Sequence, residues 1–267
     1  MTKLSQIENK ESPQILLIYG APLSGKTSAV AHFAKKYKLH WFDLDGKHQS
    51  IYSAIDKQYW ENIELFRCVD TPEKPRSASL VLKALSSTKP ITFCQAHGDL
   101  QCNQCMIAKA PMETFDLSSL KCGEDIIVID NLSTVSDSTM SKNLGFVDAF
   151  TPKVKEYGHY NKQEFTLNNL LAYAKSCGVH VILIAHEASQ TYEDDAVKLT
   201  PVCGSKAYST RIAGKIHHVV RARFHNMKFK LSSEAEAEPG AQLGTVSGRK
   251  VKDVESLIQI FTPMPQG

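Results

Sequence analysis

The sequence contains no apolar run near the roughly 18 residues that a membrane-spanning helix needs. Its first segment, MTKLSQIENKES, has no apolar stretch of the kind that forms the core of a secretory signal peptide. The net charge of +3 is too small to indicate a nucleic-acid partner and too small to exclude one. We therefore expect a cytoplasmic protein without a membrane partner.

Cysteine is also sparse, and its number is odd. The chain has 7 cysteines among 267 residues, and thiols stay reduced in the cytoplasm, so we expect no disulfide framework. Metal ligation or ordinary buried thiols remain as their roles. Hydrophobic residues make up 42% of the chain, enough to build the core of one large domain or two small ones.

Short apolar runs alternate with helical stretches along the chain. The pattern predicts helices at 24–37 and 166–178, and a possible strand at 256–261. Strands are predicted at 15–19, 40–45, 124–130, 180–187 and 216–224. This alternation indicates an α/β fold with a mainly parallel sheet and helices on both faces.

Residues 20–27 read GAPLSGKT and match the phosphate-loop pattern G-x-x-x-x-G-K-[ST] in full. The loop follows a buried strand and opens a helix, which is the structural context that this motif requires. Lys26 is expected to neutralise the β and γ phosphates of a nucleotide, and the Thr27 hydroxyl to ligate Mg²⁺. The expected nucleotide-binding residues are Gly20, Ala21, Pro22, Leu23, Ser24, Gly25, Lys26, Thr27 and Ser28.

Carboxylates at strand ends are candidates for the metal and for catalysis. Asp130 ends the strand EDIIVID and is expected to reach the Mg²⁺, although Asn131 follows it where many ATPases have a catalytic Glu. Asp43 and Asp45 end the strand HWFDLD, and alternation would place both on one face. We favour Asp45 as the residue that orients the attacking water, the alternative being a carboxylate that caps the following turn.

His186 ends the strand HVILIAHE. If this strand neighbours the first one, His186 lies beside the phosphate loop and can sense the γ-phosphate by hydrogen bonding. Glu187 beside it can relay that signal. The alternative is a histidine packed at a strand end.

The ordered segments GAPLSGKT, FDLD, IIVID and ILIAHE resemble the RecA-type core ATPases. The likeness is closest to the compact phage-encoded RecA-like ATPases of recombination and single-strand annealing. It extends over 13–224 and includes the segment GSKAYSTRIAGKIHHVVRARF (204–224). In the C-terminal tail, SGR (247–249) is similar to a short Ser-Arg motif of the phage members. The resemblance implies a RecA-like ATPase core at 13–230, preceded by a loose tail at 1–12 and followed by an extension at 231–267. It also implies that the protein is phage-encoded and acts in the cytoplasm of the host cell.

The same resemblance assigns roles to single residues. Asp45 falls where RecA-type proteins have a catalytic Glu, with a shorter side chain, and His186 falls at a γ-phosphate-sensing position. The family is oligomeric, with ATP at the subunit interface, which implies a homo-oligomer here. Cations that reach a neighbouring subunit's nucleotide would be Lys206, Arg211 and Lys215, the alternative being ordinary surface basic residues.

In RecA-type proteins the loop after the His186 strand contacts single-stranded DNA. Here that loop, 188–206, carries Glu193, Asp194 and Asp195, which would repel phosphates. The segment 214–230, which we call the basic strip, has no acid and has Phe224 and Phe229 interleaved for stacking on bases. The expected DNA contacts are Arg221, Arg223, Lys228 and Lys230. The alternative is a core strand with a solvated basic edge.

A separate cluster, C-x2-H-x4-C-x2-C, is formed by Cys94, His97, Cys102 and Cys105. Four soft or borderline ligands at this spacing predict a closed, structural Zn²⁺ site, in an insertion at about 90–122 between core strands. The alternative is a set of reduced cysteines in a loop.

These features favour a Mg²⁺-dependent ATPase acting on single-stranded DNA in phage recombination, repair or replication. The alternative is a nucleotide-switched loader with little turnover, whose partner is a helicase, a single-strand-binding protein or another replication protein. A small-molecule kinase is disfavoured because residues 204–223 hold too few arginines for a substrate lid: Arg211, Arg221 and Arg223.

Overall fold

The computed structural model describes residues 12–71, 74–100, 102–145, 155–191, 197–226, 228–234, 240–246 and 248–262. The strands are β1 (Ile15–Gly20), β2 (Lys38–Asp43), β3 (Ile63–Arg67), β4 (Ile91–Cys94), β5 (Met112–Phe115), β6 (Asp125–Asp130), β7 (His180–Thr191), β8 (Val197–Pro201), β9 (His218–His225), β10 (Lys228–Ser232) and β11 (Gly244–Thr245). The α-helices are α1 (Lys26–Ala31), α2 (Gln49–Tyr52), α3 (Ser77–Ser86), α4 (Asn103–Ile107), α5 (Leu132–Leu144), α6 (Tyr157–Ser176), α7 (Lys206–Arg211) and α8 (Val254–Ile258).

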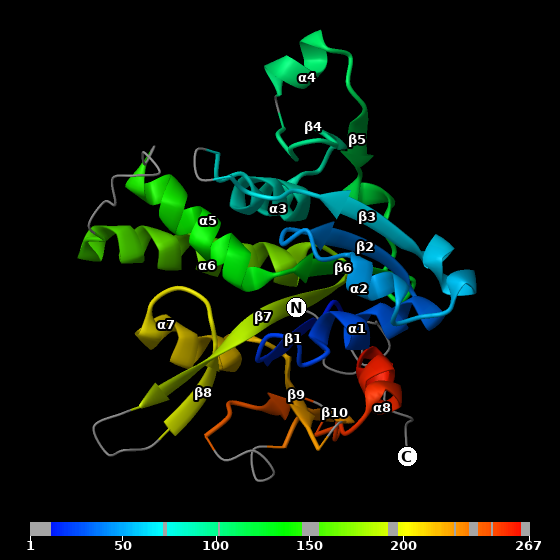
Figure 1. The fold of residues 1–267 in the computed structure, drawn as a ribbon, viewed down its shortest axis with the longest axis vertical. Helices are drawn as coiled ribbons and strands as arrows, with labels where there is room; N and C mark the ends of the chain where they lie inside the picture. Colours follow the sequence, from blue (N-terminus) through cyan, green and yellow to red (C-terminus); the bar gives the residue numbers. More distant parts are fainter. Residues whose placement is uncertain are drawn as a thin grey trace, which may run out of the picture.

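One large sheet organises the chain (Figure 1). In the described residues its order is β10-β9-β1-β7-β6-β2-β3, with β8 paired to β7 and β11 paired to β9. The central pairs, from β9 through β1, β7, β6 and β2 to β3, are parallel, and β8, β10 and β11 join antiparallel. The predicted α/β fold with a mainly parallel sheet is confirmed.

Both faces of the sheet are covered by helices. Alternate residues of β1 enter different cores, with Leu17 and Tyr19 on one face and Leu16 and Ile18 on the other. The first face packs against α3, α5, α6 and α7, and the second against α1, α2 and α8. Burial on both faces explains why the central strands are almost wholly apolar. None of the helices in the described ranges is both long and apolar enough to cross a membrane.

A small hairpin of β4 and β5, with α4 between them, projects from the body (Figure 1). It lies between β3 and β6 in the chain, and so corresponds to the predicted insertion at about 90–122. Its base is held by aromatic packing: the ring of Phe93 lies 5.8 Å from that of Phe66, and Phe115 meets Phe66 edge-on at 5.5 Å. The hairpin is anchored at its base by these rings, and the loop after β4 is joined to the body by an ion pair of Asp99 with Arg76 at 3.2 Å.

The predicted strand at 256–261 is wrong. The segment forms α8 and a following 3-10 turn, Gln259–Phe261. Asp253 caps the helix by accepting a hydrogen bond from the backbone N–H of Ser256 at 2.8 Å. Leu257 and Phe261 are buried in the core that also contains α1, so the segment belongs to the same folded body as the phosphate loop.

Several boundaries also differ from the sequence prediction. The second strand ends at Asp43, two residues before Asp45. The helix after the phosphate loop turns into a 3-10 helix at His32–Lys35, and α6 begins at Tyr157 instead of residue 166. The boundary expected at residue 230 falls inside β10. Residues 1–11, the acidic residues 193–195 and Ser247 of the SGR motif lie outside the described residues.

Two buried histidines tie the amino-terminal end of the sheet to the C-terminal segment. His180 accepts a hydrogen bond at Nδ1 from the backbone N–H of Gln14 at 3.1 Å, and its ring stacks on Phe261 at 4.3 Å. The Nε2 atom of His218 lies 2.9 Å from the side-chain oxygen of Gln14. Burial, with a smaller contribution from His217, lowers the pKa of both His180 and His218 from 6.5 to about 4.

This burial predicts loss of stability in acid. Between pH 6.5 and about 4 the unfolded chain binds protons at His180 and His218 that the folded chain excludes. Each unit by which the folded-state pKa lies below 6.5 lowers the free energy of unfolding in acid by about 1.4 kcal/mol per histidine. Urea unfolding at a series of pH values should show the free energy of unfolding falling in this window, and His180→Gln should flatten the fall. An unchanged pH slope in the variant would contradict this assignment.

Candidate nucleotide-binding site and metal centre

The phosphate loop leaves β1 at a point where only glycine fits. A Cβ on Gly20 would lie 2.0 Å from the backbone oxygen of Ala222 on β9. The turn is completed by Gly25, whose φ of +83° is in the left-handed region that favours glycine. Leu23 at the tip is 93% exposed. The loop is thus shaped by its two glycines, as the sequence pattern requires.

Lys26 is folded back onto the loop. Its Nζ donates to the backbone oxygens of Gly20 at 2.9 Å and Ala21 at 2.7 Å, and lies 3.5 Å from Oγ of Ser24. Burial lowers the pKa of Lys26 to about 8, opposed by the negative charge of Asp130. The ammonium group therefore lies beside the loop backbone, at the place where the motif is expected to bind phosphate.

Thr27 and Asp130 form the predicted pair. The Thr27 hydroxyl donates to Oδ2 of Asp130 at 3.0 Å, and Asp130 is 6% exposed. Burial raises the pKa of Asp130 to about 7, partly offset by the hydrogen bond from Thr27. Two adjacent oxygen donors of this type, one of them a carboxylate, are ligands that suit Mg²⁺.

Asp45 lies beyond the end of β2 and accepts hydrogen bonds from three donors. Its carboxylate accepts from the Thr134 hydroxyl, from Asn131 Nδ2 at 2.5 Å and from Lys47 Nζ at 3.1 Å, and lies 3.7 Å from His186 Nε2. Burial raises the pKa of Asp45, but the hydrogen bonds from His186, Thr134 and Lys47 outweigh it and lower the value to about 2. Asp45 is thus fixed in orientation and ionised at neutral pH.

Asp43, expected on the same face as Asp45, has different hydrogen-bond partners. Asp43 accepts from the backbone N–H of Lys47 at 3.1 Å and lies 2.8 Å from Nδ1 of His48. It closes the turn after β2, which is the capping role weighed as the alternative. The assigned strand ends at Asp43, although Phe42 and Leu44 still enter the same core.

His186 lies where the sequence placed it. Because β7 pairs in parallel with β1, His186 is the register partner of Gly20, at the start of the phosphate loop. Its Nε2 is 3.3 Å from Nδ2 of Asn131. His186 therefore joins the network around Asp45 rather than packing as an isolated strand-end histidine.

These side chains line one cavity of about 510 Å³. The lining combines the phosphate loop with the ends of three strands: Pro22, Leu23, Ser24, Gly25, Lys26, Thr27, Ser28, Asp45, Gly46, Lys47, Gln49, Ser50, Asp130, Asn131, Ile184, His186 and Phe229. Sequence reasoning missed Lys47 and Thr134. Thr134 had a local signal, since Asn131 caps α5 by accepting from the N–H of the residue three positions on, at 2.8 Å.

The candidate DNA contacts fall into two groups. Arg221 donates from Nε to Oε2 of Glu187 at 2.6 Å and its side chain is 15% exposed, so it is already ion-paired, and its contact with DNA stays a prediction. Lys228 and Lys230 are exposed and Arg223 is partly buried. The rings of Phe224 and Phe229 lie 4.9 Å apart and are 51% and 64% exposed.

The cations expected to reach a neighbouring subunit lie on and after α7. Arg211 donates to Glu164 of α6 at 3.0 Å, and Lys215 donates to Asn168 of α6 at 2.6 Å. Lys206 is exposed at the start of α7. Their action on a second subunit stays a prediction.

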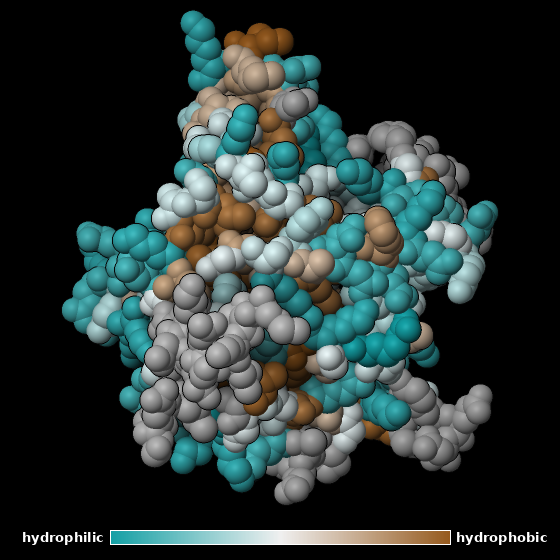
Figure 2. All heavy atoms as spheres, turned by 180° about the vertical axis from the view of Figure 1, so that it is seen from behind, coloured by the Kyte–Doolittle hydropathy of each residue, from teal (hydrophilic) through white to brown (hydrophobic). Residues whose placement is uncertain are grey.

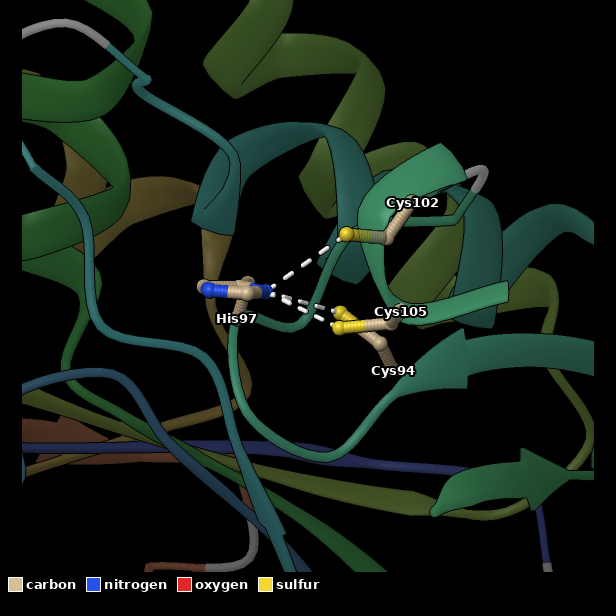
Figure 3. Close-up of side chains that lie close together, drawn as sticks. All are labelled: Cys94, His97, Cys102 and Cys105. Carbon is tan, nitrogen blue, oxygen red and sulfur yellow. Dashed lines mark hydrogen bonds between the residues drawn. The ribbon is translucent and has the colours of Figure 1, made fainter. Parts of the chain in front are cut away.

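The Cys/His cluster is assembled in the projecting hairpin (Figure 3). The ligand atoms of Cys94, His97, Cys102 and Cys105 all lie within 4.8 Å of one another. The three sulfurs are 3.5, 3.5 and 3.3 Å from Nδ1 of His97. Ligands at Zn–S and Zn–N bond lengths on a tetrahedron are roughly 3.5 Å apart, so the donor set fits zinc.

Comparison with known proteins gives one family match and two distant structural likenesses. A family model described as an AAA domain matches residues 12–242. The structure of a prototypical ATPase from the type III secretion system of pathogenic bacteria aligns with 91% of this chain at 9% identity and a TM-score of 0.47, and the chain spans 57% of that protein. A KaiC-like protein from the archaeon Pyrococcus horikoshii OT3 aligns with 82% of this chain and 76% of its own length, at 12% identity and a TM-score of 0.40.

Among curated protein sequences, none matches the chain significantly. The family match, however, covers most of the chain and includes the phosphate loop, Asp45, Asp130 and His186. The chain therefore belongs to the AAA domain family, and its core is a mainly parallel sheet with the phosphate loop after β1.

Proposed function

We propose that this protein binds ATP with Mg²⁺ and hydrolyses it. The observation that carries the proposal is the convergence, in one cavity, of a lysine in the phosphate loop, a Thr–Asp pair and a second carboxylate with a much lower pKa. Phosphoryl transfer depends mainly on positioning and on stabilising charge, and these groups supply both. The family supports a nucleotide as the ligand of this cavity.

Each side chain has a distinct task in this proposal. Lys26 binds the terminal phosphates once they displace the loop carbonyls from its ammonium group. Thr27 and Asp130 would hold Mg²⁺, which neutralises phosphate charge when bound. Asp45 orients the attacking water by accepting its hydrogen bond. Its low pKa suits it to positioning water more than to removing a proton early in the reaction.

Replacing Lys26 tests this proposal. We expect Lys26→Ala to lower kcat/KM for Mg²⁺–ATP by at least about 100-fold, since it removes the charge that binds the transferring phosphates. Hydrolysis is followed by release of inorganic phosphate from the purified protein. Lys36→Ala, on the same segment but bonded to Thr262 at 2.7 Å, is the matched control and should retain activity. Equal rates in both variants would contradict the proposal.

We further infer that the ATPase acts on single-stranded DNA, in phage recombination, repair or replication. The basic strip supports this with two exposed lysines, Lys228 and Lys230, which flank Phe229 along β10, and with the neighbouring exposed rings of Phe224 and Phe229. Exposed aromatic rings on which bases can stack, in a positively charged segment, are typical of sequence-tolerant binding to single strands. Phe229 also lines the nucleotide cavity, where its ring packs over Gly25, so one side chain connects the two sites.

The double variant Lys228→Ala/Lys230→Ala is expected to weaken binding to oligothymidylate. Loss of two phosphate contacts should also reduce the slope of log affinity against log salt by about 2. Fluorescence anisotropy at several salt concentrations measures both. Lys121→Ala, which removes one positive charge from a surface outside the strip, is the control, because Lys121 lies in an exposed pair with Glu124 at 3.4 Å. A salt slope unchanged from the wild type would contradict the role of the strip.

A second candidate function is a nucleotide-switched loader of a replication protein. Asn131 stands where many ATPases have a catalytic Glu, which favours slow turnover. The tip of the projecting hairpin carries the exposed apolar residues Met106 and Ile107, 52% and 84% exposed, and apolar surface is visible there in Figure 2. ATP-dependent capture of a replication protein, together with hydrolysis indifferent to DNA, would favour this function over the first.

We also propose that the Cys/His cluster holds one structural Zn²⁺. Three thiolates and one imidazole close the coordination shell, so the metal would act as a structural staple. The hairpin beyond Phe93 has few buried side chains other than the cysteines themselves, so metal binding would supply much of its order.

Zinc removal should unfold the hairpin and leave the nucleotide site intact. We expect one equivalent of zinc per chain by elemental analysis, and loss of it in Cys102→Ser. Limited proteolysis should then cut within residues 95–110, while binding of ATP stays within about 3-fold of the wild type. The isolated Cys177→Ser is the control. Zinc-free wild-type protein with a protease-resistant hairpin would overturn the assignment.

A further inference from the structure

The nucleotide cavity contains a second lysine that the phosphate-loop motif does not explain. Lys47 follows β2 in the turn that begins at Asp45, and its side chain lines the cavity together with Lys26. Its backbone is fixed, because its N–H donates to Oδ1 of Asp43 at 3.1 Å. Gly46, with φ of +68°, allows the tight turn that aims Lys47 back toward the site.

The charges of the cavity show why a second cation belongs there. The described lining has two carboxylates, Asp45 and Asp130, and two lysines, Lys26 and Lys47. Without Lys47 the acidic groups would outnumber the lysines, in a site that must accept a polyphosphate. Lys47 and Lys26 already interact, since the charge of Lys47 contributes to the lowered pKa of Lys26.

The ammonium group of Lys47 can also exchange its present partner, Asp45, for a phosphate oxygen. Its Nζ is 3.1 Å from Oδ2 of Asp45, and its side chain is 67% exposed. Because the Lys47 ammonium group faces solvent, a phosphate oxygen in the cavity can compete with Asp45 for it. Asp45 would keep its bonds from Thr134 and Asn131 after the exchange. Its Oδ2 would lose one donor and become free to accept a hydrogen bond from water.

We propose that Lys47 is a catalytic residue that contacts the terminal phosphate and supplies, from the same chain, the cation that stabilises the transferring phosphoryl group. This inference rests on the proposed ATPase function. It replaces the expectation that the cation must come from Lys206, Arg211 or Lys215 of a neighbouring subunit. Arg211 and Lys215 are bonded to α6, whereas Lys47 already lines the cavity.

The reaction it assists is ordinary hydrolysis. The water oxygen forms a bond to the terminal phosphorus, and the bond from that phosphorus to the bridging oxygen breaks with its electron pair leaving on ADP. One water proton remains on inorganic phosphate, and the other passes by way of Asp45 to solvent. Lys47 keeps its own protons throughout and donates a hydrogen bond to a non-bridging oxygen, whose charge grows in the transition state.

Binding of a transition-state analogue separates this role from a structural one. We expect Lys47→Ala to bind ADP within about 3-fold of the wild type but to bind ADP–aluminium fluoride at least about 100-fold more weakly, with an equal fall in kcat. Lys47→Arg should recover part of both. Lys121→Ala is the control, as before. The rate per chain should not depend on protein concentration, because the cation acts within one chain.

Three results would overturn the inference. The first is wild-type binding of ADP–aluminium fluoride by Lys47→Ala. The second is an equal loss of ADP and of the analogue, which would show a structural or general binding role. The third is loss of analogue binding in Lys206→Ala with none in Lys47→Ala, which would place the cation on a neighbouring subunit. A wild-type protein that hydrolyses no ATP refutes the proposed function itself, which distinguishes the two failures.

Discussion

The parallel register of four adjacent strands is the constraint on which the rest of this structure depends. Gly20 of β1 pairs with His186 of β7, and Asp130 of β6 pairs with both Ile184 of β7 and Asp43 of β2. Because parallel strands end at the same edge of a sheet, segments more than 150 residues apart in the chain meet in one cavity. A slip of one residue in β6 would turn Asp130 to the opposite face and away from Thr27.

Environment then gives similar side chains different tasks. Asp130 is buried with one hydroxyl donor, and its pKa rises to about 7, whereas Asp45 has several donors, and its pKa falls to about 2. A carboxylate that gains strongly from a nearby cation suits metal binding, and one that is already ionised and fixed suits the orientation of water. Because both residues are aspartates, the difference between their pKa values comes mainly from hydrogen bonding and burial.

Local patterns in the sequence were sufficient for β1, β2, β6, β7 and β9, for the phosphate loop and for the spacing of the Cys/His cluster, whereas the shorter and peripheral strands, β3, β4, β5, β8, β10 and β11, were not predicted. Each predicted feature depends on residues close in the chain: an apolar run, glycines at fixed spacing, or ligand pairs two residues apart. The errors and omissions came from tertiary partners. The ion pair of Arg221 was missed because Glu187 is far away in sequence, and residues 256–261 have strand-like alternation but form a helix capped by Asp253. Lys47 and Thr134 carry no motif, and only the folded turn after β2 brings them to Asp45.

The central claim is that this edge of the sheet is a Mg²⁺-dependent nucleotide site. Calorimetric titration of the wild-type protein and of Asp130→Asn with a non-hydrolysable ATP analogue, with and without Mg²⁺, tests it most directly. The account predicts one site per chain, tighter with Mg²⁺ than without it, and predicts that Asp130→Asn loses the dependence on Mg²⁺ while still binding through the loop. No binding by the wild type, or a Mg²⁺ dependence that survives in Asp130→Asn, would contradict it.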